Sequence, residues 1–356
     1  MASPAARPAP SLVVRAGPEA LATIRREGFR PDDFSTMLGA SGGPKWLVLS
    51  RLDRMLARRF VAGRSAPLHA FGTSIGAFRH TCHAQADPAA AFDRFEEAYV
   101  AQAYERKPTP VEVTDESRRI LDVMLAGGDD PLAHPHLRLH VGTVRSRRPA
   151  ATDARAALVL GLGAAAAANA VSRRLLGVFF ERVVFHATAA PVFGFGDLAT
   201  RHARLDAANL RAATLASGSI PLVMAAIEDV PGGPRGLYRD GGITDYHFAM
   251  DFEAPPGLVL YPHFFDSIVP GWFDKMLTWR RATGPLLART VFVAPSREFV
   301  ATLPGGKVPD REDFVAYSTA ERQRIWKQVL AASQRLADDF EHLLESDRLV
   351  QAARPF

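Results

Sequence analysis

Cysteine, long apolar runs and basic tracts are all scarce in this chain of 356 residues. The single cysteine, Cys82, excludes an intrachain disulfide and a metal site built from several thiolates, and it fits a reducing cytoplasm. The net charge of +5 is not gathered into a basic tract interleaved with aromatic side chains, so we expect no nucleic-acid partner. The rest of the composition, 47% hydrophobic and 23% charged, is typical of a soluble globular protein.

The sequence also lacks a segment with the length and apolar character of a membrane span. The best candidate, Ala156–Val171, is mostly Ala and Gly with Asn169 inside it, and it falls short of about 20 strongly apolar residues. We interpret the wider segment 155–180 either as a buried helix or oligomer contact, or as a surface that docks peripherally on a membrane. Residues 1–15 begin with an Ala- and Pro-rich stretch and have no signal-peptide core, so we expect a disordered leader.

Apolar periodicity predicts one α/β domain over residues 30–300, with helices over 311–347 covering the same sheet. No internal repeat or linker-like break divides the chain. The strands that we expect are Phe34–Leu38, Leu68–Gly72, Leu137–Thr143, Val183–Ala187 with a hairpin partner at Val192–Phe195, Leu258–Tyr261 and Thr290–Val293. The helices that we expect cover residues 18–28, 44–60, 74–85, 88–126 with a break at two prolines, 155–176, 207–216 and 313–344.

The first two strands are each followed by a glycine-containing turn and a helix. Two such units in succession imply parallel neighbouring strands joined by a right-handed crossover. The loop 39–45 and the turn 72–76 would then both lie at the carboxyl ends of the strands, where open α/β sheets bind ligands.

The second turn has the pattern Gly-x-Ser-x-Gly, with Ser74 at its centre. In this pattern the serine occupies a strained turn from strand to helix, and Gly72 and Gly76 let the backbones pass closely. The helix N-terminus adds a positive end near the hydroxyl. Ser74 is therefore a candidate nucleophile, and the alternative is a glycine- and serine-rich turn without chemistry.

Two further motifs complete the requirements of acyl transfer, which are a nucleophile, a base and donors for the oxyanion. The backbone N–H groups of Gly42 and Gly43 are candidate oxyanion donors, whereas Pro44 has no N–H to donate. Asp240 follows a short strand and begins an Asp-Gly-Gly turn, which makes it a candidate base.

Taken together, these motifs resemble those of the patatin-like phospholipases, a family of lipid acyl hydrolases. The resemblance runs from about residue 34 to 248 and rests on Ser41–Trp46 for the glycine-rich loop, Gly72–Gly76 for the serine turn, Ala216–Pro221 for a small-residue helix end, and Asp240 with Gly241 and Gly242. Within the loop, Ser41, Lys45 and Trp46 stand where the family commonly has glycine, arginine and glycine.

The resemblance implies a three-layer patatin-like fold with a mostly parallel central sheet. It also implies a Ser74–Asp240 dyad without histidine, an acyl-enzyme on Ser74, hydrolysis of carboxylic esters of lipids, and no metal or cofactor. Ser41 and Lys45 would support the loop. The class of lipid or ester and the oligomeric state stay open.

Other functions fit parts of the sequence. His247 or His263 could complete a Ser–Asp–His triad of α/β-hydrolase type, since both follow Asp240. A nucleotide cradle at Gly39–Lys45 is disfavoured because the loop matches neither common phosphate-binding motif. A metal pair at His80 and His83 lacks a third ligand at matching spacing. A catalytically weak scaffold that binds lipid or a partner protein is a further alternative.

Overall fold

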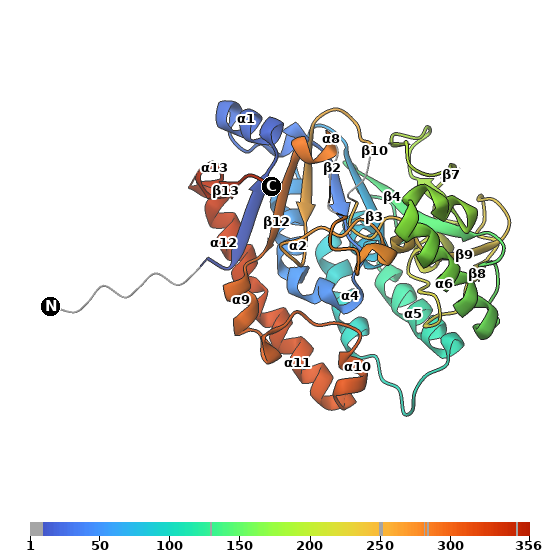
Figure 1. Cartoon of the computed structure of the whole chain (residues 1–356). Helices are drawn as coiled ribbons and strands as arrows, with labels where there is room; N and C mark the ends of the chain where they lie inside the picture. Colours follow the sequence, from blue (N-terminus) through green and yellow to red (C-terminus); the bar gives the residue numbers. More distant parts are fainter. Residues whose placement is uncertain (1–9, 129, 249–251, 281, 283–284, 347) are drawn as a thin grey trace.

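The computed structural model describes residues 10–356 except 129, 249–251, 281, 283–284 and 347. The described residues form a mixed, mostly parallel sheet of eleven strands flanked by helices (Figure 1). Along the sheet the strands are β13 (Ala353–Arg354), β1 (Leu12–Ala16), β12 (Thr290–Pro295), β11 (Leu258–Pro262), β2 (Phe34–Gly39), β3 (Leu68–Thr73), β4 (Leu137–Ser146), β5 (Phe180–His186) and β7 (Thr200–Arg204), with β9 (Leu237–Asp240) and β8 (Ile227–Glu228) paired beyond β4.

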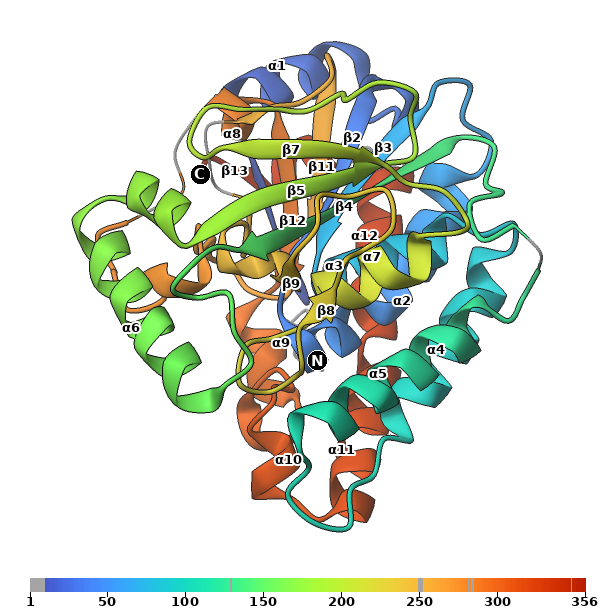
Figure 2. The same cartoon turned by 90° about the vertical axis from the view of Figure 1, so that its right-hand side faces the viewer.

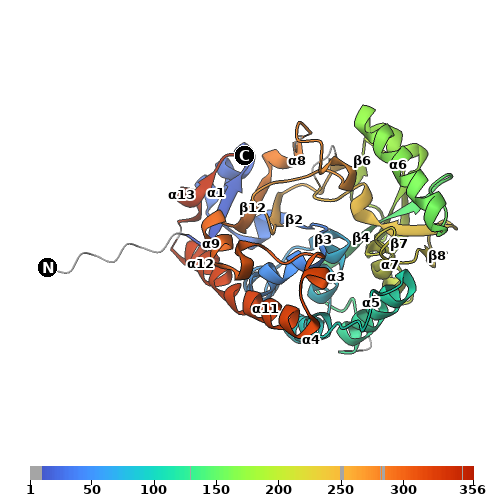
Figure 3. The same ribbon diagram turned by 60° about the horizontal axis from the view of Figure 1, so that its bottom comes forward.

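The strands from β12 to β4 run parallel, and their apolar side chains are buried on both faces. Helices surround them: α1 (Pro18–Glu27), α2 (Ser50–Leu56), α3 (Ile75–His83), α4 (Pro88–Val100), α5 (Pro110–Leu125), α6 (Arg155–Val171), α7 (Leu210–Ser217), α8 (Pro285–Ala288), α9 (Arg297–Thr302), α10 (Asp313–Ala316), α11 (Thr319–Ala332), α12 (Gln334–Glu345) and α13 (Leu349–Ala352). Figure 3 shows α11 and α12 on the opposite side of the molecule from α6. The predicted α/β class and alternation of strands and helices are confirmed.

Two predictions about individual segments were wrong. The predicted leader extends to residue 15, but Leu12–Ala16 forms β1, which pairs antiparallel with β12 because Leu12, Val14 and Ala16 are buried. Residues 1–9 of that leader lie outside the described part. The predicted hairpin at 192–195 does not form: β5 pairs with β4 and β7, while β6 (Gly194–Phe195) pairs with β10 (Phe252–Glu253) in a separate small sheet.

The C-terminal region consists of α10, α11 and α12, a broken form of the helix expected over 313–344, because Ser318 and Ser333 begin new helical segments. Helix α12 packs on α2, and α11 contacts the helical turn η2 (Gly43–Leu49). The chain then continues past residue 347 to β13, which pairs with β1 at the edge of the sheet.

A row of four histidines crosses strands β3, β4, β5 and β7. Ring nitrogens of successive residues are 3.0, 2.9 and 2.9 Å apart from His69 through His140 and His186 to His202. Phe193 packs against the rings of His69, His140 and His186. Since a neutral imidazole has one donor and one acceptor, neutral rings can satisfy this row in sequence. Burial lowers the pKa of His140 well below its ordinary value.

The described helices include none that is both long and apolar enough to cross a membrane. Helix α6, which contains the Ala-rich segment, buries Leu158, Leu162 and Ala165 in a small core with Leu176 and Phe180. It also leaves Leu160 and Val171 largely exposed. Figure 2 shows α6 beside the ends of β4 and β5, at the margin of the sheet.

Candidate active site

The turn at Ser74 joins β3 to α3 in the way that its glycine pattern predicts. Ser74 has φ of 52°, which is in the left-handed region and strained for a residue with a side chain. Glycines make the turn possible: a Cβ at residue 76 would collide with the Gly39 carbonyl, and a Cβ at residue 72 would lie 2.5 Å from the carbonyl carbon of Gly76. The N-terminus of α3 therefore approaches β2 closely, and Ser74 stands at its start.

Strand β4 is the element that brings Asp240 to Ser74. Its first half pairs with β3 up to Gly142, opposite Thr73, and the next residue, Thr143, pairs with Asp240 of β9. The end of β3 and the end of β9 therefore lie against adjacent residues of one strand. Gly241 needs its lack of a side chain here, because a Cβ would collide with the Gly142 carbonyl.

The hydroxyl of Ser74 donates a hydrogen bond of 2.6 Å to Oδ2 of Asp240. The backbone N–H of Gly242 donates to the other carboxylate oxygen at 2.7 Å. Both side chains are buried. Burial raises the pKa of Asp240 to about 6, against the lowering effects of these two hydrogen bonds and of the charges on Arg311 and Lys275. A carboxylate with a raised pKa is a stronger base for the serine proton.

A second serine fixes the backbone at this turn. The N–H of Ser74 donates to Oγ of Ser217 at 2.9 Å, and the Ser217 hydroxyl donates to the Gly142 carbonyl at 2.6 Å. Ser217 is the last residue of α7 and is fully buried. It belongs to the small-residue block 216–221 of the sequence, but its contact with the turn was not predicted.

The glycine loop lies beside the dyad. Gly42 and Gly43 line one pocket with Ser74 and Asp240. Gly43 begins η2 with φ of 57°, and N–H groups in the first turn of a helical segment have no acceptor within that segment. A Cβ at residue 42 would come within 2.6 Å of the Phe264 ring. This arrangement fits the predicted oxyanion donors.

Ser41 holds the loop to the rest of the site. Its N–H donates to the Tyr246 carbonyl at 2.9 Å, and its hydroxyl is 2.9 Å from the hydroxyl of Thr73. The neighbouring Trp46 does not enter the pocket. It is fully buried and stacks on Phe95 with ring centroids 4.3 Å apart, so the bulky side chain packs the loop against α4.

The pocket combines an apolar wall with three cations. Besides the dyad and Gly42, Gly43 and Gly242, its lining consists of Ser41, Lys45, Ile220, Pro221, Ile243, Tyr246, Trp272, Lys275 and Arg311. Gly72, Gly76 and Gly241 lie behind it and shape the turns. All the predicted site residues thus meet at one place.

The other candidate histidines have different partners. Nδ1 of His247 accepts from the Val269 N–H at 3.0 Å, and Nδ1 of His263 lies 2.7 Å from the carbonyl oxygen and 3.0 Å from the amide nitrogen of Phe265. Burial lowers the pKa of His263 to about 3. Neither imidazole is the partner of the Ser74 hydroxyl, which bonds to Asp240. In the described chain, no group of three or more His, Cys, Asp or Glu residues is placed to hold a metal ion.

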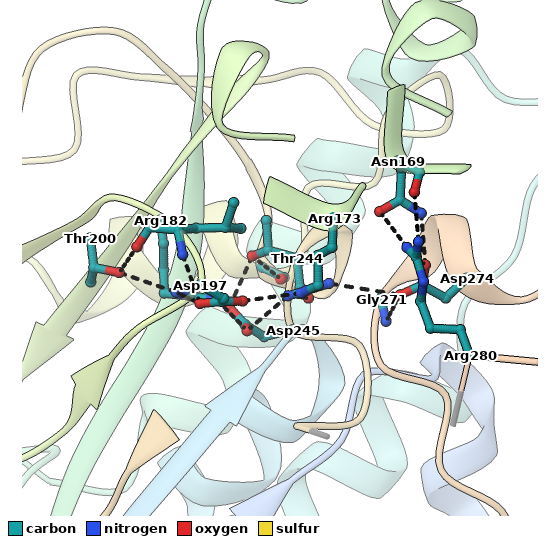
Figure 4. A network of polar contacts seen from close by, with 12 residues as sticks. Asn169, Arg173, Arg182, Asp197, Thr200, Thr244, Asp245, Gly271, Asp274 and Arg280 are labelled. Carbon is teal, nitrogen blue, oxygen red and sulfur yellow. Dashed lines mark hydrogen bonds and ion pairs between the residues drawn. The ribbon is translucent and has the colours of Figure 1, made fainter. Parts of the chain in front are cut away.

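A buried network of charges supports the site from behind (Figure 4). Arg182 of β5 binds both Asp245 and Asp197, at 2.7 and 2.8 Å. Arg173, which follows α6, is 3.0 Å from Asp197 and donates to the Thr244 carbonyl at 2.6 Å. The network therefore joins β5 and the end of α6 to the segment that follows Asp240.

The same network continues to the segment that carries Trp272 and Lys275. Asp274 accepts hydrogen bonds from Asn169 of α6 at 2.7 Å and from Arg280 at 2.8 Å. It also accepts from the Gly271 N–H at 2.9 Å. The position of the pocket-lining residues Trp272 and Lys275 thus depends on contacts with α6. Sequence reasoning missed Asp245, Lys275 and Arg311, because each reaches the site through contacts distant in the chain and has no motif around it.

We compared the chain with models of protein families and with curated proteins, and neither comparison gives a match.

Proposed function

We propose that this protein is a patatin-type serine hydrolase that cleaves carboxylic esters of lipids through an acyl-enzyme on Ser74. The observation that carries the proposal is the 2.6 Å hydrogen bond from the Ser74 hydroxyl to the buried carboxylate of Asp240. The adjacent Gly42 and Gly43 and the apolar side chains Ile220, Pro221 and Ile243 support an acyl ester as substrate.

The reaction has two halves. Ser74 Oγ attacks the acyl carbonyl carbon while Asp240 takes the hydroxyl proton, and the N–H groups of Gly42 and Gly43 stabilise the oxyanion. The intermediate collapses, the C–O bond to the alcohol breaks, and the alcohol leaves with the proton from Asp240. Water then attacks the acyl-enzyme, Asp240 accepts its proton, and Ser74 is restored as the fatty acid leaves.

The test is hydrolysis of 4-nitrophenyl esters and of acylglycerols by the native protein and by matched variants. Ser74→Ala and Asp240→Asn should each lower kcat/KM by about 1,000-fold or more, because each removes a group used in the transition state. His247→Ala and Ser65→Ala should retain activity. Full activity in folded Ser74→Ala would contradict the proposal, and a loss in His247→Ala equal to that in Asp240→Asn would favour a triad.

A further inference from the structure

Three cationic side chains from separate segments line the same pocket as the dyad. Lys45 comes from η2, Lys275 from the turn after Trp272, and Arg311 from the loop before α10. The pocket lining contains a single acidic side chain, Asp240. Asp240 is already hydrogen-bonded to Ser74 and Gly242. The site therefore holds more positive than negative charge.

Within the described chain none of these cations has a carboxylate oxygen within 4 Å, although Asp310 and Asp313 act on Lys45 from farther away, whereas nearby cations form ion pairs. Lys307 is 2.8 Å from Asp313, and Arg280 is 2.8 Å from Asp274. The ammonium group of Lys275 instead lies over the Tyr246 ring, 4.3 Å from its centroid.

Lys45 and Arg311 differ in their surroundings, and neither forms a close ion pair in the described chain. Nζ of Lys45 lies 5.7 Å from the centroid of the Phe265 ring. Arg311 is exposed and lines the pocket. Charges left unpaired around a concave site attract an ion of opposite sign.

Burial and repulsion between the cations lower the pKa of Lys275. The desolvated surroundings of its ammonium group, together with Arg311 and Lys45, lower the pKa of Lys275 to about 8. Burial is also the main cause of the lowered pKa of Lys45. An anion placed among the three groups would offset both effects.

We propose that Lys45, Lys275 and Arg311 form an anion subsite that holds a phosphate or carboxylate group of the substrate beside the scissile ester. The inference rests on the proposed function and adds a preference: the substrate is an acyl ester that carries negative charge near its alcohol portion. Arg311 supplies a planar pair of donors for such a group, and the lysines supply mobile point charges. A quaternary ammonium group in the same position would be repelled.

The kinetic test compares 1-acylglycerol 3-phosphate with the 1-acylglycerol of the same chain, both in neutral detergent micelles. Lys275→Met and Arg311→Gln should each lower kcat/KM for the phosphate-bearing ester by about 10-fold or more and leave the neutral ester within about twofold. Lys327→Met, which removes an exposed lysine on α11, is the matched control and should change neither. Equal losses on both esters would overturn the inference, because the cations would then act on the reaction centre alone.

A binding test separates this inference from the proposed function. Inorganic phosphate and glycerol 3-phosphate are titrated into folded Ser74→Ala, in which no turnover occurs, with tryptophan emission as the readout. Saturable binding that Lys275→Met and Arg311→Gln abolish supports the subsite even where hydrolysis is not found. Binding of inorganic phosphate without discrimination between the two acyl esters would overturn the substrate preference, and no binding of either anion would overturn the subsite.

Discussion

Arg182 forms two hydrogen bonds to Asp245, of 2.7 and 2.8 Å, and both side chains are buried. The backbone carbonyl of the same Asp245 accepts a hydrogen bond of 2.7 Å from the hydroxyl of Thr73. Thr73 precedes the candidate nucleophile, and Asp245 lies five residues after the candidate base. One ion pair therefore fixes the two chain segments that must stay in register for the Ser74–Asp240 contact.

Neutralising Asp245 should weaken both stability and catalysis. Asp245→Asn keeps the shape of the side chain but removes one of the two carboxylates that pair with Arg182. Breaking a buried ion pair costs about 3 kcal/mol or more. We expect denaturant unfolding to report this loss and kcat to fall about 10-fold or more from misplacement of the dyad. Asp122→Asn, which removes an exposed partner of Arg211, is the matched control. Unchanged kcat in Asp245→Asn would contradict the positioning role.

The glycine loop should tolerate no side chain at residue 42. The added methyl group of Gly42→Ala would press on the Phe264 ring and displace the loop, and we expect kcat to fall by about 100-fold as an oxyanion donor moves. Gly43→Ala has space but adopts φ of 57°, which costs about 1 kcal/mol.

The control for this pair is Gly63→Ala, at a distant turn with φ of 76° and open space around it. It shares the backbone strain of Gly43→Ala and should leave kcat unchanged. Assays of initial rate and urea unfolding on all three variants would separate strain from catalysis. Equal activity in Gly42→Ala and Gly63→Ala would show that the loop does not take part.

The pH dependence of the reaction should report Asp240. Since Asp240 accepts the serine proton only as a carboxylate, kcat/KM on a neutral ester should rise with pH through about 6 and then level off. A neutral ester is chosen so that the substrate adds no charge of its own for Lys275 to bind. A profile that is flat between pH 5 and 7 in the native protein would contradict the role of Asp240 as base.

The row of histidines should make the fold sensitive to mild acid. Burial lowers the pKa of His69 to about 4 and that of His186 to about 3, so below pH 6.5 the unfolded chain binds protons that the folded chain does not. Stability is therefore fully present above about pH 7 and declines toward pH 5, by about 1.4 kcal/mol per pH unit for each such residue.

Urea unfolding from pH 7.5 to 5 measures that slope. His186→Gln removes one of the buried imidazoles and should flatten it, whereas His342→Gln, at an exposed position on α12, should not. The same slope in His186→Gln as in the native protein would show that His186 is not responsible.

The dyad and its glycines could be predicted from the sequence because local backbone geometry dictates them. The turn at Ser74 requires glycine on both sides, and this requirement produces the five-residue pattern Gly-x-Ser-x-Gly. Asp240 could be assigned because its Asp-Gly-Gly turn stands in the expected order after the serine turn. Whether the fold is specifically of patatin type stays a prediction.

The remaining parts of the site depend on contacts that sequence spacing does not encode. Lys275 and Arg311 enter the pocket from irregular segments, and Asp245 acts through Arg182, 63 residues earlier in the chain. Strand β1 was missed because its short apolar run adjoins an Ala- and Pro-rich stretch, and its partner, β12, lies near the other end of the chain. In each of these cases the position of the residue or strand depends on contacts with distant parts of the chain, which local sequence does not encode.

Fluorophosphonate labelling with peptide mapping tests the central claim most directly. The native protein should carry the label on Ser74, folded Ser74→Ala should carry none, and Asp240→Asn should react about 100-fold more slowly because the hydroxyl has lost its base. Labelling of another residue in the native protein, or undiminished labelling of Ser74→Ala, would contradict the account.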